Sequence, residues 1–146
     1  MIGEELGRLL AGGDVVSLSG SLGVGKTVFI HGVARGLDVD DPVTSPSFMI
    51  VQEYEGRCPV FHADFYRLRS YQELEGIGWD DYLRRHGVIL IEWGNLFPEA
   101  LPSEFLQIDI NQSEPIETAR LIRFEPRGGH YEAIVKELAD RCGYLA

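Results

Sequence analysis

An eight-residue segment, Gly20-Ser-Leu-Gly-Val-Gly-Lys-Thr27, constrains the fold of this chain more than any other feature. It follows the pattern G-x-x-x-x-G-K-[S/T], in which successive backbone N–H groups curl around phosphate oxygens. A β-branched run, Val15 to Ser19, comes directly before it, and a helical pattern from Val28 to Arg35 comes directly after it. A strand, such a loop and a helix in this order form a phosphate-binding unit. The segment therefore predicts a nucleoside triphosphate site within an α/β fold.

The residues of this loop have separate roles in binding a triphosphate. Glycine tolerates positive φ and close approach of the backbone, and the helix that starts near Lys26 presents unpaired N–H groups. The Lys26 ammonium would neutralise the β- and γ-phosphates, and the Thr27 hydroxyl would coordinate Mg²⁺. A glycine-rich turn that matches by chance is the alternative, but Lys26 is one of only two lysines. The expected nucleotide-binding residues are Gly20, Gly23, Gly25, Lys26, Thr27 and Val28.

Two further segments place a carboxylate after a run of mostly apolar residues. They are Val88-Ile-Leu-Ile-Glu92 and Val60-Phe-His-Ala-Asp64, and both have the form of a strand that ends in an acid. Ligands of α/β sheets bind at the carboxyl ends of the strands. The alternative for each is an ordinary acid at the surface. With the phosphate loop present, we assign Glu92 to the Mg²⁺ side and Asp64 to the attacking water or a loop contact, a division that the sequence leaves open.

The segment Thr44-Ser-Pro-Ser47 follows the first phosphate-binding unit and is rich in hydroxyl groups. A switch-like loop at this place can bring a hydroxyl to the γ-phosphate or Mg²⁺, and Ser45 and Ser47 are the candidates. A serine–proline turn that opens a strand explains the same residues equally well. Trp93, directly after Glu92, either stacks on a base or lies in the core.

The length and the residue pattern predict one domain, residues 1–146, with a mixed α/β fold. We expect a sheet like that of the phosphate-loop NTPases, with helices on both faces and antiparallel strands near the C-terminus. A hairpin is expected from Phe48 to Asp64, and Ser70-Tyr-Gln-Glu73 predicts a helix start with a capping box. The other expected elements are helices over 2–10, 80–85 and 131–142, and strands over 87–92, 106–110 and 119–124.

Charge and cysteine content exclude several classes of protein. With 13 basic and 23 acidic residues the chain has a formal charge of −10, so it is a poor binder of bulk nucleic acid or of anionic membranes by itself. Cys58 and Cys142 lack the spacing of a metal site. No segment approaches the ~20 apolar residues of a membrane span, and the N-terminus does not have the pattern of a signal peptide. We therefore expect a soluble, cytoplasmic protein.

Several short motifs occur together in an order that resembles one known family. After the phosphate loop come Thr44-Ser-Pro-Ser-Phe48, His62-Ala-Asp-Phe-Tyr-Arg67, Glu73-Leu-Glu75, and Ile91-Glu-Trp93 followed by Leu101-Pro102. In this order they resemble the TsaE (YjeE) family, the small ATPases of bacterial tRNA threonylcarbamoyladenosine synthesis, and the resemblance extends from Glu4 to Arg120. The chain begins later than many members do, and Ser21, Ser47 and Ala63 stand where an Asp, a Thr and an aromatic residue are usual.

This resemblance implies slow hydrolysis of ATP in support of the modification of adenosine 37 in ANN-decoding tRNAs. The partner that it implies is the TsaB–TsaD heterodimer, with tRNA involved only indirectly. ATP would bind at Gly20–Thr27, and Thr27 and Glu92 would lie on the Mg²⁺ side. Asp64 would be the other essential acid, so the expected catalytic residues are Asp64 and Lys26. Ser45 and Ser47 would belong to the switch-like loop of the family.

Three other functions share parts of this pattern. A small-molecule kinase would use the same phosphate loop, but it needs an acceptor pocket and an arginine-bearing lid, for which Arg84-Arg85 is the candidate. A GTP-binding switch usually needs an Asn-Lys-x-Asp segment, and the two lysines of the chain lie elsewhere. The non-enzymatic alternative is an interaction module with a vestigial loop. Hydrolysis of ATP without an acceptor separates the ATPase from the kinase.

Overall fold

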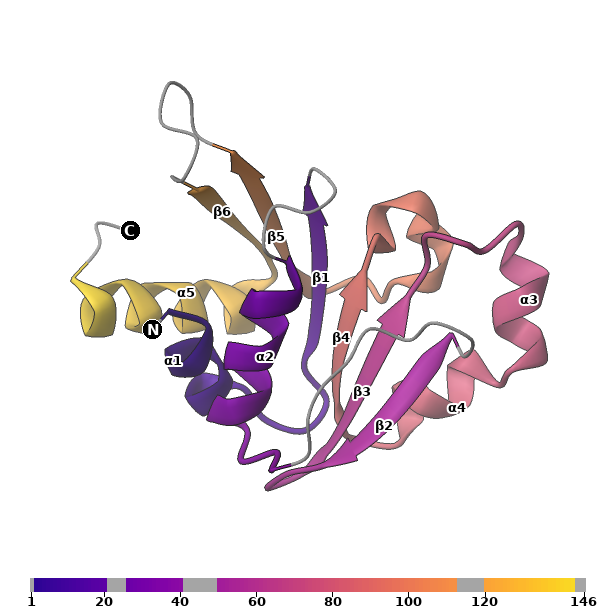
Figure 1. Ribbon diagram of the computed structural model, residues 1–146, viewed down its shortest axis with the longest axis horizontal. Coiled ribbons are helices and arrows are strands. Elements are labelled where there is room, and N and C mark those ends of the chain that lie inside the picture. Colours follow the sequence, from indigo (N-terminus) through magenta and orange to yellow (C-terminus); the bar gives the residue numbers. More distant parts are fainter. Residues whose placement is uncertain (1, 21–25, 41–49, 113–119, 144–146) are drawn as a thin grey trace.

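The computed structural model describes residues 2–20, 26–40, 50–112 and 120–143. Six strands of this part of the chain form one sheet in the order β2-β3-β4-β1-β5-β6 (Figure 1). The strands β3, β4, β1 and β5 are parallel, and β2 and β6 are antiparallel at the two edges. This arrangement confirms the predicted mixed sheet with an antiparallel C-terminal pair. The bounds are β1 Val15–Gly20, β2 Val51–Glu55, β3 Pro59–Asp64, β4 Val88–Glu92, β5 Phe105–Gln112 and β6 Arg120–Arg127.

The described helices cover both faces of this sheet. Figure 1 shows α1, α2 and α5 gathered on one side, and α3 and α4 on the other, as the sequence predicted. None of the described helices is long and apolar enough to cross a membrane. The bounds are α1 Ile2–Leu9, α2 Lys26–Gly36, α3 Tyr71–Gly76, α4 Trp79–Arg84 and α5 Gly129–Cys142, with the 3-10 helices η1 Gly94–Leu96 and η2 Pro98–Ala100.

Alternation of side chains along the strands divides the hydrophobic core into two layers. On β1, Val16 and Leu18 pack in the layer of α1, α2 and α5, whereas Val15 packs in the layer of α3 and α4. All five residues of β4 are buried, as expected of a central parallel strand covered on both faces. In the second layer Trp79 donates its indole N–H to the carbonyl oxygen of Ala100 at 2.9 Å. Both faces of the sheet are therefore covered by a hydrophobic layer.

The helices α1 and α2 contact each other through backbone atoms. A Cβ on Gly7 of α1 would lie 2.2 Å from the carbonyl oxygen of Val33 in α2, and one on Gly36 would lie 2.1 Å from that of Glu4. Both distances are far inside van der Waals contact, so only glycine allows the helices to approach this closely. The close pairing fixes the direction of α2, whose N-terminus carries Lys26.

Arg57, in the turn between β2 and β3, ties this hairpin to the ends of both helices. Its guanidinium donates to the carbonyl oxygens of Gly7 and Gly36 at 2.8 Å each, and to that of Leu10 at 2.6 Å. The last carbonyl groups of a helix have no partner within the helix, and a cation near them is favourable. One side chain thus joins three separate elements.

Two local predictions were only partly right. The helix α3 begins at Tyr71 as predicted, but the Ser70 side chain makes no capping hydrogen bond. Instead, Oε1 of Glu73 accepts the backbone N–H of Arg69 at 3.2 Å. The strand expected from Phe48 begins at Val51 within the described residues, and Phe48 itself lies outside them.

Candidate functional site

The carboxyl ends of three neighbouring parallel strands meet at one edge of the sheet. Asp64 ends β3 and lies in register with Glu92, which ends β4. On the other side of Glu92 lies Leu18 of β1, and β1 ends two residues later at Gly20, where the phosphate loop begins. The described chain resumes with Lys26 at the start of α2. Both acids therefore lie beside the base of the loop, where the register of the parallel strands brings them together.

Lys26 is buried at the N-terminus of α2, with only 4% of its surface exposed. Its Nζ donates to the carbonyl oxygen of Gly20 at 3.2 Å and lies 3.7 Å from the centre of the Trp93 ring. Burial lowers the pKa of Lys26, and the negative charges of Glu92 and Asp64 oppose this shift. The ammonium is thus held near both acids by a carbonyl oxygen and an aromatic face, contacts that phosphate oxygens can replace.

Asp64 is half-buried, and its Oδ1 accepts the backbone N–H of Tyr66 at 3.0 Å. Burial raises the pKa of Asp64 and the charge of Glu92 adds to the rise, while the Tyr66 hydrogen bond and the charge of Lys26 oppose it. A carboxylate with a raised pKa is a stronger base than an ordinary one. The environment of Asp64 therefore suits a group that accepts a proton.

Glu92 is more buried than Asp64 and is held by a neighbouring ring. Its side chain is 6% exposed, and its Oε2 lies 2.8 Å from Nε2 of His62, a ring that is 1% exposed. The backbone is held as well, since the carbonyl oxygen of Glu92 accepts the N–H of Phe65 at 3.0 Å. Glu92 is therefore a fixed carboxylate, in contrast to the more exposed Asp64.

Trp93 has a left-handed backbone conformation, with φ of 62°. This conformation is uncommon for a residue other than glycine, and Asp38 and His86 also have it in the described part of the chain. The backbone N–H of Trp93 donates to the carbonyl oxygen of Leu18 at 2.8 Å, and its ring centre lies 5.3 Å from that of Tyr66. The half-buried indole lies against the Lys26 ammonium, so it belongs to the site itself.

The structure places the other predicted residues as follows. Thr27 and Val28 lie in the first turn of α2, where both are exposed. Gly20 has φ of 134°, and a Cβ there would lie 1.9 Å from the carbonyl oxygen of Ile110 in β5, so packing between strands also requires glycine at this position. The remaining predicted residues, Gly23, Gly25, Ser45 and Ser47, lie outside the described residues, as does Ser21.

The described residues fit a magnesium–nucleotide ligand. The first N–H groups of a helix have no partner within the helix, so the N-terminus of α2, which carries Lys26, suits phosphate oxygens. The oxygens of Thr27 and Glu92 are of the type that Mg²⁺ prefers. No group of three or more His, Cys, Asp or Glu among the described residues could hold a metal ion. Mg²⁺ in nucleotide sites takes most of its ligands from phosphates and water, so it needs no cage of protein ligands.

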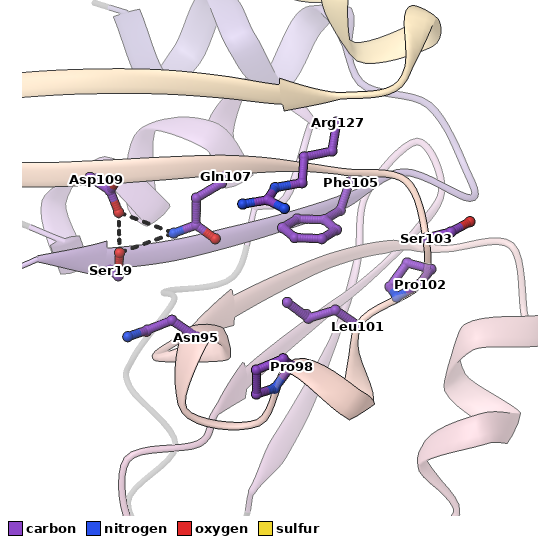
Figure 2. Close-up of a pocket in the computed structure, with 10 residues that line it drawn as sticks. All are labelled: Ser19, Asn95, Pro98, Leu101, Pro102, Ser103, Phe105, Gln107, Asp109 and Arg127. Atoms are coloured by element: carbon purple, nitrogen blue, oxygen red, sulfur yellow. Dashed lines mark hydrogen bonds between the residues drawn. The ribbon is translucent and has the colours of Figure 1, made fainter.

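A separate hollow of about 570 Å³ lies along β1 and β5 (Figure 2). In it Gln107 donates from Nε2 to Ser19 Oγ at 3.0 Å and to Asp109 Oδ1 at 3.1 Å, and the Ser19 hydroxyl also donates to Asp109. These side chains alternate with the core residues Leu18 and Ile108, so they face away from α1 and α2. The described lining does not include the lysine or the acids of the candidate site, which is therefore distinct from this hollow.

His62 received no separate role from the sequence, although it lies two residues before Asp64 in the same motif. The available signal was strand alternation, because residues two apart in a strand face the same side. What the sequence does not show is the register between β3 and β4, which brings the His62 ring to Glu92.

Comparison with known proteins shows a family similarity over most of the chain. The family model described as "Threonylcarbamoyl adenosine biosynthesis protein TsaE" matches residues 1–122. The tRNA threonylcarbamoyladenosine biosynthesis protein TsaE of Bacillus subtilis is 44% identical over 128 residues, which cover 87% of this chain and 78% of that protein. The protein of the same name from Treponema pallidum is 40% identical over 108 residues, covering 74% of this chain and 80% of the other.

A solved structure has the same fold. The crystal structure of Bacillus subtilis YdiB is similar to this one with a TM-score of 0.78 and 37% sequence identity, and the match covers 97% of this chain and 86% of the other. The matched region includes nearly all of the described sheet and helices. The similarity is therefore one of the whole fold as well as of the phosphate loop.

Proposed function

The chain belongs to the TsaE family of threonylcarbamoyladenosine biosynthesis proteins, and on this basis we propose that it is a slow Mg-ATPase that supports this modification of tRNA. The modified base is adenosine 37, and the partner is a heterodimer like TsaB–TsaD. The observation that supports the proposal best is the meeting of Lys26 with Asp64 and Glu92 beside the base of the phosphate loop.

In the proposed reaction a water molecule attacks the γ-phosphorus, the bond to the bridging oxygen breaks, and ADP and phosphate are released. Asp64 accepts the proton of the water, a role favoured by its raised pKa and partial exposure. Lys26 stabilises the negative charge on the phosphates, and Thr27 and Glu92 would bind the Mg²⁺ that accompanies ATP. Mg²⁺ bound with ATP supplies additional positive charge at the phosphates.

The charge of the chain supports an indirect role in tRNA modification. At −10 it carries too much negative charge to bind a phosphate backbone well by itself. A partner that holds the tRNA removes this difficulty. In this scheme the chain hydrolyses ATP in support of the partner, and the partner transfers the threonylcarbamoyl group to the base.

The kinase alternative finds less support. Its predicted arginine lid, Arg84-Arg85, lies at the C-terminal end of α4, just before β4. The Arg85 side chain donates to both carboxylate oxygens of Glu53, at 2.5 and 3.2 Å, and lies over the Phe61 ring at 4.8 Å. The lining of the hollow in Figure 2 does not include Lys26 or either acid, so it is poorly placed for a phosphoryl acceptor.

ATP turnover by the purified chain with Mg²⁺ and no acceptor tests the proposal. We expect slow release of phosphate that falls about 100-fold or more in Asp64→Asn and Glu92→Gln, because each variant loses a carboxylate used in the reaction. Asp80→Asn, an exposed acid of α4, is the matched control and should keep the wild-type rate. Normal turnover in Asp64→Asn or in Glu92→Gln would refute the role given to that residue.

A binding titration against a TsaB–TsaD heterodimer, with and without Mg-ATP, tests the partner. We expect tighter binding in the presence of nucleotide, because the partner would bind preferentially to the conformation that the loops adopt around ATP. Affinity that does not change with nucleotide would contradict control of the partner by ATP.

A further inference from the structure

His62 lies in β3 two residues before Asp64, in the interior of the sheet. Its ring is 1% exposed, and Nε2 lies 2.8 Å from Oε2 of Glu92. In the register of β3 and β4, His62 pairs with Leu90, two residues before Glu92. The ring therefore contacts the carboxylate at the end of the next strand without reaching the open edge of the sheet.

The second ring nitrogen indicates where the proton of His62 lies. Nδ1 is buried and has no hydrogen-bond partner among the described residues. A buried N–H without an acceptor is costly, which favours the tautomer with hydrogen on Nε2 and none on Nδ1. The Nε2–H consequently donates to Oε2 of Glu92, which as a carboxylate can only accept.

We propose that His62 is a positioning residue, whose Nε2–H fixes one carboxylate oxygen of Glu92 and so leaves the other available to the metal side of the nucleotide site. The inference rests on the proposed role of Glu92 in Mg-ATP binding. A ligand carboxylate held by a second hydrogen bond is oriented before the metal arrives, which reduces the ordering cost of binding. Because the His62 ring is almost fully buried, it acts through Glu92 and does not contact the reacting atoms.

The first experiment measures the Mg²⁺ concentration needed for half-maximal binding of a non-hydrolysable ATP analogue. His62→Gln places an amide N–H close to the former Nε2–H, whereas the side chain of His62→Asn reaches only the position of Nδ1. We expect His62→Asn to raise the Mg²⁺ requirement about 10-fold or more, as loss of an outer hydrogen bond does at metal sites, and His62→Gln to recover most of that loss. An unchanged Mg²⁺ requirement in His62→Asn, or equal losses in both variants, would overturn the proposal.

The chain contains a matched control for this experiment. Nε2 of His130 lies 2.7 Å from Oδ1 of Asp14, which precedes β1 at the opposite end of the sheet. This is a second histidine–carboxylate pair, away from the phosphate loop, in which the histidine side chain is 55% exposed. His130→Asn should leave the Mg²⁺ requirement unchanged, and a shift equal to that of His62→Asn would show a general effect on stability and refute the positioning role.

A double-mutant cycle shows whether His62 acts through Glu92. In the Glu92→Gln protein, His62→Asn should cause no further rise in the Mg²⁺ requirement, because the carboxylate that it positions is already lost. A further rise of the same size as in the wild-type background would overturn the proposal.

Nitrogen NMR of the histidine-labelled, nucleotide-free protein provides a readout that is independent of activity. We expect the His62 ring to show the tautomer with hydrogen on Nε2, and a signal for hydrogen on Nδ1 alone would overturn the inference. The proposed function is tested separately. If Glu92→Gln leaves Mg-ATP binding and turnover intact, the proposed role of Glu92 in binding Mg²⁺ is refuted. If Glu92→Gln impairs both and His62→Asn impairs neither, only the positioning role is refuted.

Discussion

At the scale of single residues, Lys26 provides the most direct test of nucleotide binding. Lys26→Ala removes a buried ammonium at the N-terminus of α2. A hydrogen bond to a charged group contributes about 2 kcal/mol, so we expect ATP affinity to fall roughly thirtyfold or more. Titration calorimetry with Mg-ATP measures this. Lys136→Ala is the matched control, since Lys136 is the second lysine of the chain and is exposed on α5; loss of affinity in both variants would contradict the prediction.

The ionised Asp64 carboxylate is expected to lower the stability of the fold although the proposed reaction uses it. Because its pKa is raised in the folded protein, the folded state keeps this proton to a higher pH than the unfolded chain does. The contribution of Asp64 to the free energy of unfolding therefore decreases as the pH rises from the usual aspartate pKa to the raised one. Above both pKa values the ionised carboxylate is unfavourable in the folded protein. Asp64→Asn keeps an oxygen for the Tyr66 N–H and removes this charge.

We accordingly expect Asp64→Asn to melt at a higher temperature than the wild type near neutral pH. The difference should shrink as the pH falls below about 4, the usual aspartate pKa, because the wild-type carboxyl then becomes protonated in both states. Melting temperature as a function of pH, with Asp80→Asn as the control, tests this. A variant less stable than the wild type at neutral pH would show that the burial cost of Asp64 is compensated elsewhere.

At the scale of elements, the pair α1 and α2 shows why composition alone misleads. Glycine inside a helix lowers its intrinsic stability, yet Gly7 and Gly36 allow the two helix backbones to touch. The stability of α1 thus depends on its contact with α2, and the position of Lys26 depends on the same contact.

Gly7→Ala should destabilise the protein by about 1–3 kcal/mol, because the added methyl group meets the backbone of α2 and the helices must separate. Urea unfolding measures the change. Gly76→Ala, at the end of α3, is the matched control because a Cβ there meets nothing within 4 Å. Its expected effect is neutral or slightly stabilising. Equal stability of the two variants would contradict the tight contact of α1 with α2.

At the scale of the whole molecule, Arg57 connects the β2–β3 hairpin to both helices of the phosphate-loop side. Arg57→Met keeps most of the aliphatic stem and leaves the helix-end carbonyls without their cationic donor. Charged hydrogen bonds of this kind contribute about 1.5–3 kcal/mol each and are not additive, so we expect a loss of roughly 3 kcal/mol in the free energy of unfolding. Arg35→Met, exposed on α2, should change it little. Similar losses in both variants would argue against the role of Arg57.

The predictable part of the fold consists of patterns that are local in sequence. The strand β4 was recognised because four apolar residues precede Glu92, and α2 because a helical pattern follows the phosphate loop. The Ser70 cap was wrong in detail because a capping box depends on side-chain rotamers that the motif does not specify. The Arg57 contacts were not predicted, since they join residues 47 and 50 positions apart.

The sequence by itself determined the phosphate loop, the mixed α/β fold and the place of Asp64 and Glu92 at strand ends. These follow from residue order within a few turns of chain and from the rule that parallel strands end at one edge. Only the tertiary structure decided that His62 holds Glu92, 30 residues away, and that the Trp93 ring lies on the Lys26 ammonium. The physical reason is that such contacts depend on strand register and on the direction of α2, which packing of the whole core determines.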